Sequence, residues 1–141
     1  MRENAIVLDT SVLLEILMRT PYGVKVIRSI YYGEYEPHTT YLNLAESLYI
    51  LCRRLGYEEA WKRLEILLDS GYFIVHDLSE IHRYIGECKC RFPISLADCT
   101  SLSLAKLLNK PILFFKVEEE FKGVLKELEE WLGSRILFLM K

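Results

Sequence analysis

The chain alternates between short apolar runs and longer segments in which apolar residues recur every three or four positions. The apolar runs predict buried strands at residues 5–8, 72–76, 112–115 and 135–139. Residues 36–40, with the sequence Glu-Pro-His-Thr-Thr, predict at most a short strand or a turn. The segments between these runs are long enough for helices, so the pattern indicates strands that alternate with helices.

The helical period is clearest at residues 41–55, where apolar side chains occupy positions 41, 44, 45, 48, 51, 52 and 55. An α/β fold follows, with a parallel sheet that helices cover on both faces. Ligands of such folds bind at the carboxyl ends of the strands. The other predicted helices are 12–19, which Thr10 or Ser11 can cap, and 22–32, 57–70, 79–89, 95–109 and 118–132.

Composition narrows the class of protein. With 141 residues, of which 51% are hydrophobic and 27% charged, we expect one globular domain at residues 1–141. The formal net charge of -2 argues against a strongly basic nucleic-acid binder. It does not exclude a nuclease, because bound divalent metals can supply positive charge at a phosphate.

The same sequence bears on location and redox state. The apolar run near the N-terminus is too short for a signal peptide, and no stretch approaches membrane-spanning length. We therefore expect a soluble, cytoplasmic protein with no membrane partner. The four cysteines, Cys52, Cys88, Cys90 and Cys99, are expected to be reduced there, and Cys88-Lys-Cys90 lacks the spacing of a zinc site.

Carboxylates stand where a ligand site is expected. Asp9 directly follows the first strand, so it is either a metal ligand or an acceptor for the N–H groups of the next helix. Glu46 has apolar neighbours on its helix face, so it must be protonated, find a cation or reach solvent, and the candidate cations are a metal ion and Arg53. Asp98 stands three residues after Ser95, which fits a capping box as well as a metal-facing carboxylate.

Three glutamates follow the strand predicted at 112–115. Glu118 lies nearest the strand end and is expected to point into the same crevice, whereas Glu119 and Glu120 fit a solvated helix face. Converging carboxylates repel one another and raise their pKa values. Mg²⁺ or Mn²⁺, which prefer oxygen ligands, would relieve that repulsion and activate water beside a phosphate.

Four segments together resemble the PIN-domain nucleases, and among them most closely the VapC-type toxins of toxin–antitoxin pairs. The segments are IVLDTSVLLEIL, NLAESLYIL, ISLADCTSLSLAKLLNKPILFF and EEEF, and they span nearly the whole chain. This resemblance implies a five-stranded parallel sheet between helices and metal-assisted hydrolysis of RNA phosphodiesters. It also implies a homodimer and a VapB-type antitoxin that blocks the site.

The resemblance assigns roles to individual residues. Asp9, Glu46 and Asp98 correspond to the metal-binding acids, and Thr10 or Ser11 to the hydroxyl beside the first of them. In the last motif the family usually has Asp in a Thr-x-Asp-x-x-Phe context, whereas this chain has Lys116 and Glu118. Glu118 is then expected to hold a second ion or to orient the attacking water. The basic rim expected to contact the RNA backbone consists of Arg53, Lys89, Arg91 and Lys116.

Two alternatives remain open from the sequence. A PIN-like scaffold that binds RNA or protein without cleavage is consistent with the altered last motif. A phosphatase of the haloacid-dehalogenase type would also place Asp at a strand end, but it needs a second acid where this chain has Ser11.

Overall fold

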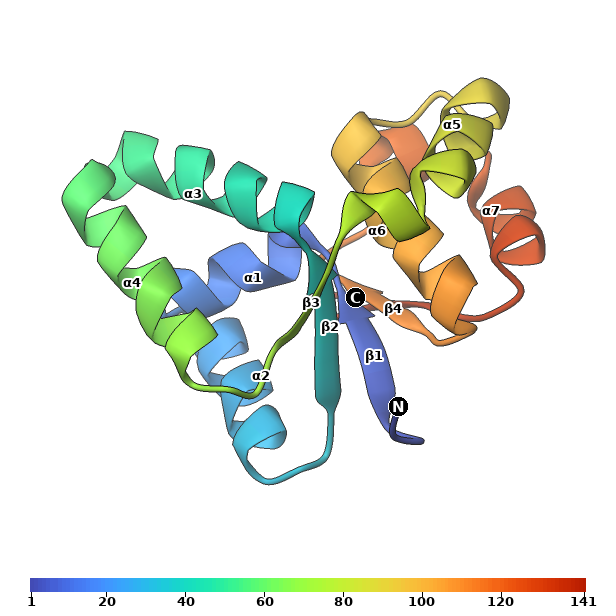
Figure 1. Ribbon diagram of the computed structural model, residues 1–141. Helices are drawn as coiled ribbons and strands as arrows, with labels where there is room; N and C mark the ends of the chain where they lie inside the picture. The colour runs from blue at the N-terminus through green and yellow to red at the C-terminus, as the bar shows by residue number, and fades with distance from the viewer.

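The structure is a computed structural model that describes residues 1–141. It has a five-stranded parallel sheet between seven α-helices, as the sequence pattern predicts (Figure 1). The strands are β1 (Ala5–Leu8), β2 (Glu36–Thr40), β3 (Ile74–His76), β4 (Ile112–Phe114) and β5 (Ile136–Phe138). The α-helices are α1 (Thr10–Leu17), α2 (Pro21–Tyr31), α3 (Tyr41–Leu55), α4 (Tyr57–Asp69), α5 (His82–Arg91), α6 (Leu96–Leu108) and α7 (Leu125–Leu132), with 3₁₀ turns η1 (Leu78–Glu80) and η2 (Glu119–Phe121).

The order of the strands in the sheet is β3-β2-β1-β4-β5. The chain moves outward from β1 through β2 to β3, and then crosses to the other side of β1 for β4 and β5. In register, Val7 of β1 lies beside His38 of β2 and beside Ile112 of β4. The direction of winding thus reverses between β1 and β4, and an open α/β sheet forms its ligand crevice beyond the strand ends at such a point.

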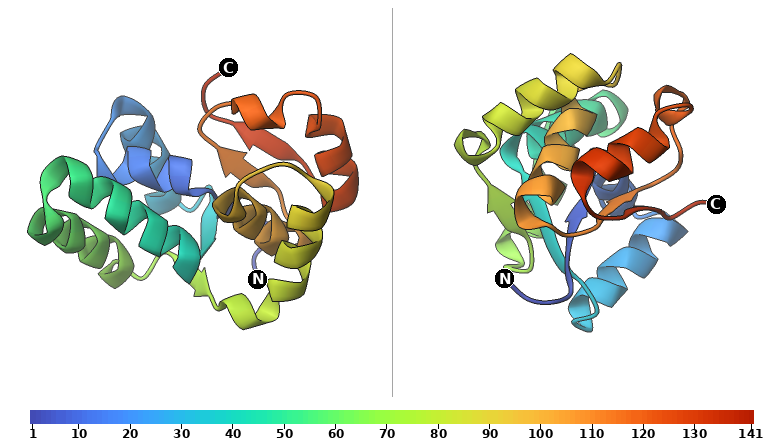
Figure 2. Two further views of the ribbon diagram at one scale, coloured as in Figure 1. Left: turned by 90° about the horizontal axis from the view of Figure 1, so that it is seen from above. Right: turned by 90° about the vertical axis from the view of Figure 1, so that its right-hand side faces the viewer.

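Each face of the sheet has its own hydrophobic core, because successive residues of β1 point to opposite faces. Ile6 and Leu8 pack with α1 to α4, whereas Val7 packs with α5, α6 and α7. Figure 2 shows the two helical layers on either side of the strands. None of the helices combines the length and apolar character that crossing a membrane requires.

The sequence underestimated β2, which is a full strand paired on both sides by β1 and β3. Its polar side chains conceal it from a search for apolar runs, yet all of them except Thr39 have hydrogen-bond partners in the fold. The ring of His38, only 3% exposed, lies with Nε2 2.7 Å from Glu36 Oε1 and with Nδ1 2.8 Å from His76 Nε2. A strand can be polar and interior when its polar groups are satisfied in this way.

The single helix predicted at 118–132 is also wrong. The segment folds as the short turn η2, then a break at Gly123, then α7. Gly123 has a φ of +90°, a conformation that side chains with a Cβ rarely adopt, so the helix cannot run through it. The break turns η2 back toward the start of α6.

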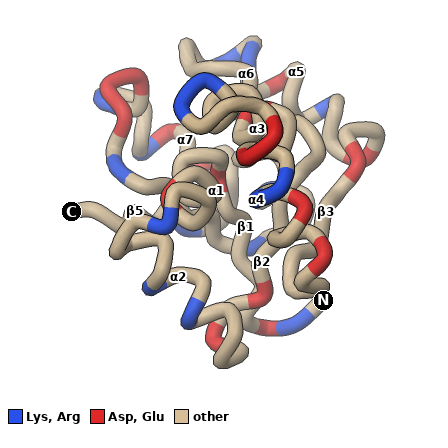
Figure 3. Tube along the Cα trace, turned by 90° about the vertical axis from the view of Figure 1, so that its left-hand side faces the viewer, with Lys and Arg blue, Asp and Glu red and all other residues tan.

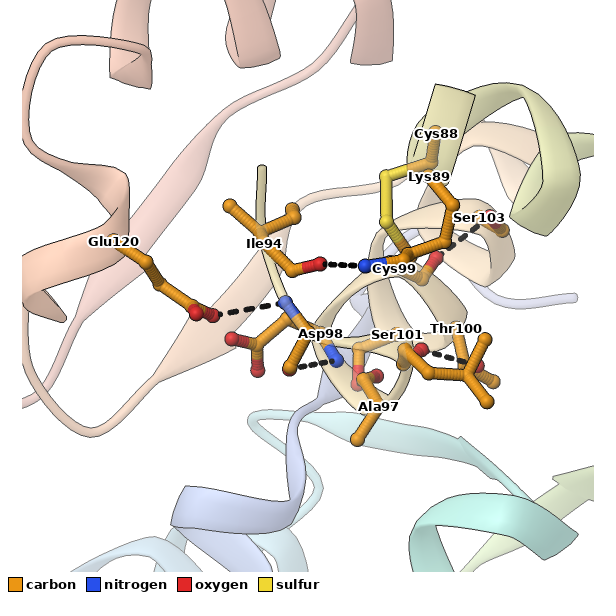
Figure 4. The surroundings of a disulfide bond; sticks show 12 residues. Cys88, Lys89, Ile94, Ala97, Asp98, Cys99, Thr100, Ser101, Ser103 and Glu120 are labelled. Atoms are coloured by element: carbon orange, nitrogen blue, oxygen red, sulfur yellow. Dashed lines mark hydrogen bonds between the residues drawn. A yellow bond between two sulfur atoms is a disulfide. The ribbon is translucent and has the colours of Figure 1, made fainter. Parts of the chain in front are cut away.

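The expectation of four reduced cysteines is contradicted as well. A disulfide joins Cys88 of α5 to Cys99 of α6, with a Cα–Cα distance of 5.7 Å (Figure 4). Cys52 and Cys90 are free thiols. Sequence spacing did not reveal this pair, because only the packing of α5 on α6 brings the two buried side chains together.

Candidate functional site

Asp9 lies at the carboxyl end of β1, at the point where the sheet reverses its winding. It is the N-cap of α1, a position that the sequence had offered to Thr10 or Ser11. Its Oδ2 accepts hydrogen bonds from the Ser11 amide at 3.0 Å and from the Ser11 hydroxyl at 2.8 Å. Its Oδ1 accepts a hydrogen bond from the Ser101 hydroxyl of α6 at 2.7 Å. Asp9 is only 3% exposed, and burial raises its pKa while these three donors oppose the rise.

Asn43 of α3 connects the elements around Asp9, and the sequence analysis did not identify it. Its Nδ2 donates to the hydroxyls of Thr10 at 2.9 Å and of Ser101 at 2.8 Å. Its Oδ1 accepts from the Thr40 hydroxyl at 2.6 Å. The network joins β2, α1, α3 and α6, and it is fully buried. Asn43 stands three residues before Glu46, which places the two side chains on the same face of α3, one turn apart. This spacing is the sequence signal from which Asn43 could have been identified.

Glu46 is partly buried and has no ion pair. The Arg53 guanidinium, which was its candidate partner, lies instead over the ring of Tyr49, 4.9 Å from the ring centroid. Burial and the nearby charge of Asp9 raise the pKa of Glu46, and the hydroxyl of Thr10 partly offsets this rise. The acids of β1 and α3 are therefore close enough to repel each other.

Ser95 is the N-cap of α6, as the capping-box interpretation predicts, and its hydroxyl accepts a hydrogen bond from the Asp98 amide at 3.1 Å. The Asp98 carboxyl does not complete the box, because the Ser95 amide donates to Glu120. The Asp98 carboxyl faces that of Glu120 instead (Figure 4). Burial, hydrogen bonding to Glu120 and the charge of Asp9 raise the pKa of Asp98 to about 9. The pKa of Glu120 is lowered by the same hydrogen bond, so the pair shares one proton.

The structure thus brings Glu120, rather than Glu118, to Asp98. Glu118 is the residue before η2, and its side chain makes no capping hydrogen bond. The Oε1 of Glu120 accepts a hydrogen bond from the Ser95 amide at 3.1 Å, so Glu120 is not the solvated residue that the sequence indicated. The next residue, Phe121, is fully buried.

The four basic residues predicted to form a rim differ in their surroundings. The amino group of Lys89 donates to the Ile94 carbonyl at 2.6 Å, and Arg91 lies 3.6 Å from Glu87. Arg53 covers Tyr49, whereas Lys116 is exposed and makes no ion pair. On the face drawn in Figure 3, basic and acidic positions are interspersed rather than gathered in one basic surface.

The donor atoms of this site suit a hard divalent cation. A carboxylate offers about four acceptor positions. Since Asp9 accepts three hydrogen bonds, Oδ1 retains one position for a metal. As the side chains lie, no three His, Cys, Asp or Glu groups are close enough to enclose one ion. Mg²⁺ usually keeps several waters and binds through one or two carboxylates, so the acids fit an ion that remains largely hydrated.

Comparison with known proteins agrees with this geometry. The model of the PIN domain family matches residues 6–124, so the chain belongs to the PIN domain family. That membership removes the haloacid-dehalogenase alternative. Comparison with curated protein sequences finds no match.

Several solved structures have a similar fold. The sarcin–ricin loop cleaving toxin VapC20 of Mycobacterium tuberculosis is similar, with a TM-score of 0.65 and 19% identity over 79% of this chain and 89% of that one. A toxin–antitoxin complex from Klebsiella pneumoniae gives 0.61 and 12% identity, with 84% and 92% covered. PAE2754 from Pyrobaculum aerophilum gives 0.51 and 19%, with 92% and 98% covered. These likenesses establish the fold.

Proposed function

We propose that this PIN domain is an endoribonuclease that depends on Mg²⁺ or Mn²⁺ and acts as the toxin of a VapBC-type pair. The observation that carries the proposal is the group of acids at the reversal point of the sheet. Burial raises the pKa values of Asp9, Glu46 and Asp98, the charge of Asp9 adds to the rise at Glu46 and Asp98, and Glu120 shares a proton with Asp98. Such a cluster is stable in its ionised form only beside a cation.

In this proposal Asp9, Glu46 and Asp98 hold the ion, in part through the waters that it keeps, and Glu120 replaces Glu118 as the fourth acid. A bound Mg²⁺ or Mn²⁺ would activate water and neutralise charge on the phosphate. Ser11 and Ser101 fix the Asp9 carboxylate through hydrogen bonds to both of its oxygens. The proton that Asp98 shares with Glu120 must leave when Asp98 binds the ion, so metal binding and proton release are coupled.

Cleavage of total RNA by the purified protein tests the proposal. We expect cleavage with Mg²⁺ or Mn²⁺, none in excess EDTA, and a loss of more than about 100-fold in Asp9→Asn. Asp69→Asn, which makes the same change at an exposed position on α4, is the matched control and should retain full activity. Cleavage that persists in EDTA would overturn the metal mechanism, and metal binding without any cleavage would favour the scaffold alternative.

We also propose an antitoxin partner and a homodimer. The similar Klebsiella structure is a toxin–antitoxin complex, which supports the first. For the second, light scattering at micromolar concentration should give about twice the chain mass of 16.6 kDa, and a mass near 16.6 kDa would contradict it.

A further inference from the structure

An apolar cleft borders the acid cluster. It has a volume of about 240 Å³ and lies between α3 and the start of α6, two helices on opposite sides of the sheet (Figure 1). Glu46, one of the candidate metal ligands, forms part of its wall, so the cleft and the acid site are adjacent. The other lining residues are Leu42, Ala45, Tyr49, Leu96 and Ala97.

The cleft exposes large apolar side chains to solvent. Tyr49 is 49% exposed and Leu96 is 53% exposed. Single exposed apolar residues are common on protein surfaces and need no explanation. Here they gather around a carboxylate of the candidate site, and an apolar surface with few polar groups is the usual character of a ligand site.

Tyr49 also has a cation beside it. Arg53 stands one helical turn further along α3, and its guanidinium lies 4.9 Å from the centroid of the Tyr49 ring. Arg53 forms no salt bridge, so its charge is not neutralised by a carboxylate. One face of α3 therefore presents an acid, then an aromatic ring, then a free cation at successive turns: Glu46, Tyr49 and Arg53.

The order of these three groups along α3 suits a stretch of RNA in which a phosphate, a base and the following phosphate lie one after another. Unpaired bases stack on aromatic rings and on guanidinium planes, and the phosphates beside them are attracted to arginine. We infer that the cleft receives the base next to the scissile phosphate, that Tyr49 stacks on this base, and that Arg53 faces the following phosphate. The inference rests on the proposed function, because it places the scissile phosphate at the acids. A base held in a duplex cannot enter the cleft, so the nucleotide at this position must be unpaired.

The test is a double-mutant cycle between Tyr49 and single bases of the RNA. Short single-stranded oligoribonucleotides that the protein cleaves in Mn²⁺ are labelled with a fluorophore and bound in Ca²⁺, which replaces the catalytic ion, and the dissociation constant is measured by anisotropy. In each oligonucleotide one position is made abasic. For the wild-type protein we expect one abasic position, next to the cleaved bond, to raise the Kd by about 5- to 150-fold.

In Tyr49→Leu, we expect the intact oligonucleotide to lose a similar factor and the abasic position to have no further effect, because base and ring act as one pair. Tyr49→Phe keeps the ring and should bind as the wild type does. Tyr57→Leu is the matched control, because Tyr57 lies on α4 and is 56% exposed, and it should change nothing.

The outcomes separate this inference from the proposed function. Cleavage in Mn²⁺ with a flat abasic scan and an unchanged Kd in Tyr49→Leu would overturn the base site alone. Coupling between Tyr49 and one base in an RNA that binds without being cleaved would overturn the nuclease alone. Absence of RNA binding would also overturn the base site. So would a Tyr49→Leu variant in which only the oligomeric state changes, as measured by light scattering, because the cleft would then be a contact between chains.

Discussion

Replacing Asp98 by Asn measures how much the free energy of unfolding falls when Asp98 ionises beside Glu120. The pKa of Asp98 rises from an ordinary value of 3.8 to about 9 in the folded protein, because the group is buried beside Glu120 and Asp9. The folded state therefore binds more protons than the unfolded state between these two values. The contribution of Asp98 to stability is fully present below about pH 4 and is lost as the pH rises toward 9.

The size of the effect follows from the same shift. Each pH unit within this window is worth about 1.36 kcal/mol, so moving from pH 5 to pH 8 costs the metal-free wild type at most roughly 4 kcal/mol. Asp98 is partly exposed, and screening by solvent reduces the expected loss to roughly 2–3 kcal/mol. Asn is neutral throughout and can still donate a hydrogen bond to Glu120, so Asp98→Asn should escape this loss.

The assay is thermal melting in excess EDTA at pH 5 and pH 8. At pH 8 the variant should melt higher than the wild type by about 4–12 °C, and the advantage should shrink at pH 5. In the wild type, Mn²⁺ should raise the melting temperature according to its affinity, and Asp98→Asn should lose that rise. Asp77→Asn, which alters an exposed acid that caps η1, is the matched control and should behave as the wild type.

The opposite result is equally well defined. If the charge of Asp98 mainly stabilises the start of α6, the variant should be less stable by about 0.3–1 kcal/mol at both pH values. It should also keep the full response to Mn²⁺. That combination would refute the carboxyl pair.

Two further predictions concern the surroundings of the acids. Asn43→Ala removes the buried hydrogen bonds that the Asn43 side chain makes to the hydroxyls of Thr10, Thr40 and Ser101. It should therefore lower the free energy of unfolding by about 1–3 kcal/mol and weaken Mn²⁺ binding, both measured by calorimetry. Asn4→Ala, at an exposed hydrogen bond to Gly33, is the control, and equal effects of the two variants would show that Asn43 does not hold the acid site in place. The double variant Cys88→Ser with Cys99→Ser should lose about 2–4 kcal/mol by denaturant unfolding, and the reductant that lowers the melting temperature of the wild type should leave this variant unaffected. An unchanged wild-type melt in reductant, with no free thiols released, would contradict this second expectation.

The sequence predicted the parts of this molecule that follow from local periodicity. The helix at 41–55 and the strand at 5–8 are confirmed with the same bounds, because each has one apolar pattern and a clear end. β2 was underestimated, since its burial depends on hydrogen bonds between His38 and residues of its own and the next strand. Local pattern carries no information about such partners.

In the candidate site, too, some residues could be predicted from local pattern, whereas others depend on contacts between elements. Asp9, Glu46 and Asp98 could be selected because each is a carboxylate at a strand end or among apolar neighbours. Glu120 could not be separated from Glu118 and Glu119, since all three are adjacent glutamates and the choice depends on how the chain turns at Gly123. The contacts of Asn43 depend on packing between helices that are distant in sequence, and the bond between Cys88 and Cys99 depends on how the consecutive helices α5 and α6 pack against each other.

The wide spacing of the acids along the chain has a consequence for when the protein can act. Asp9, Glu46, Asp98 and Glu120 come from four segments separated by other elements, and only the finished sheet with its two helical layers brings them together. Contacts this distant in sequence form late, after the entropy of closing the long loops has been overcome. A chain still emerging from the ribosome carries its first acid long before its last. Synthesis itself would therefore delay the proposed ribonuclease activity, and this delay would leave an interval in which the proposed antitoxin can bind the protein before it becomes active.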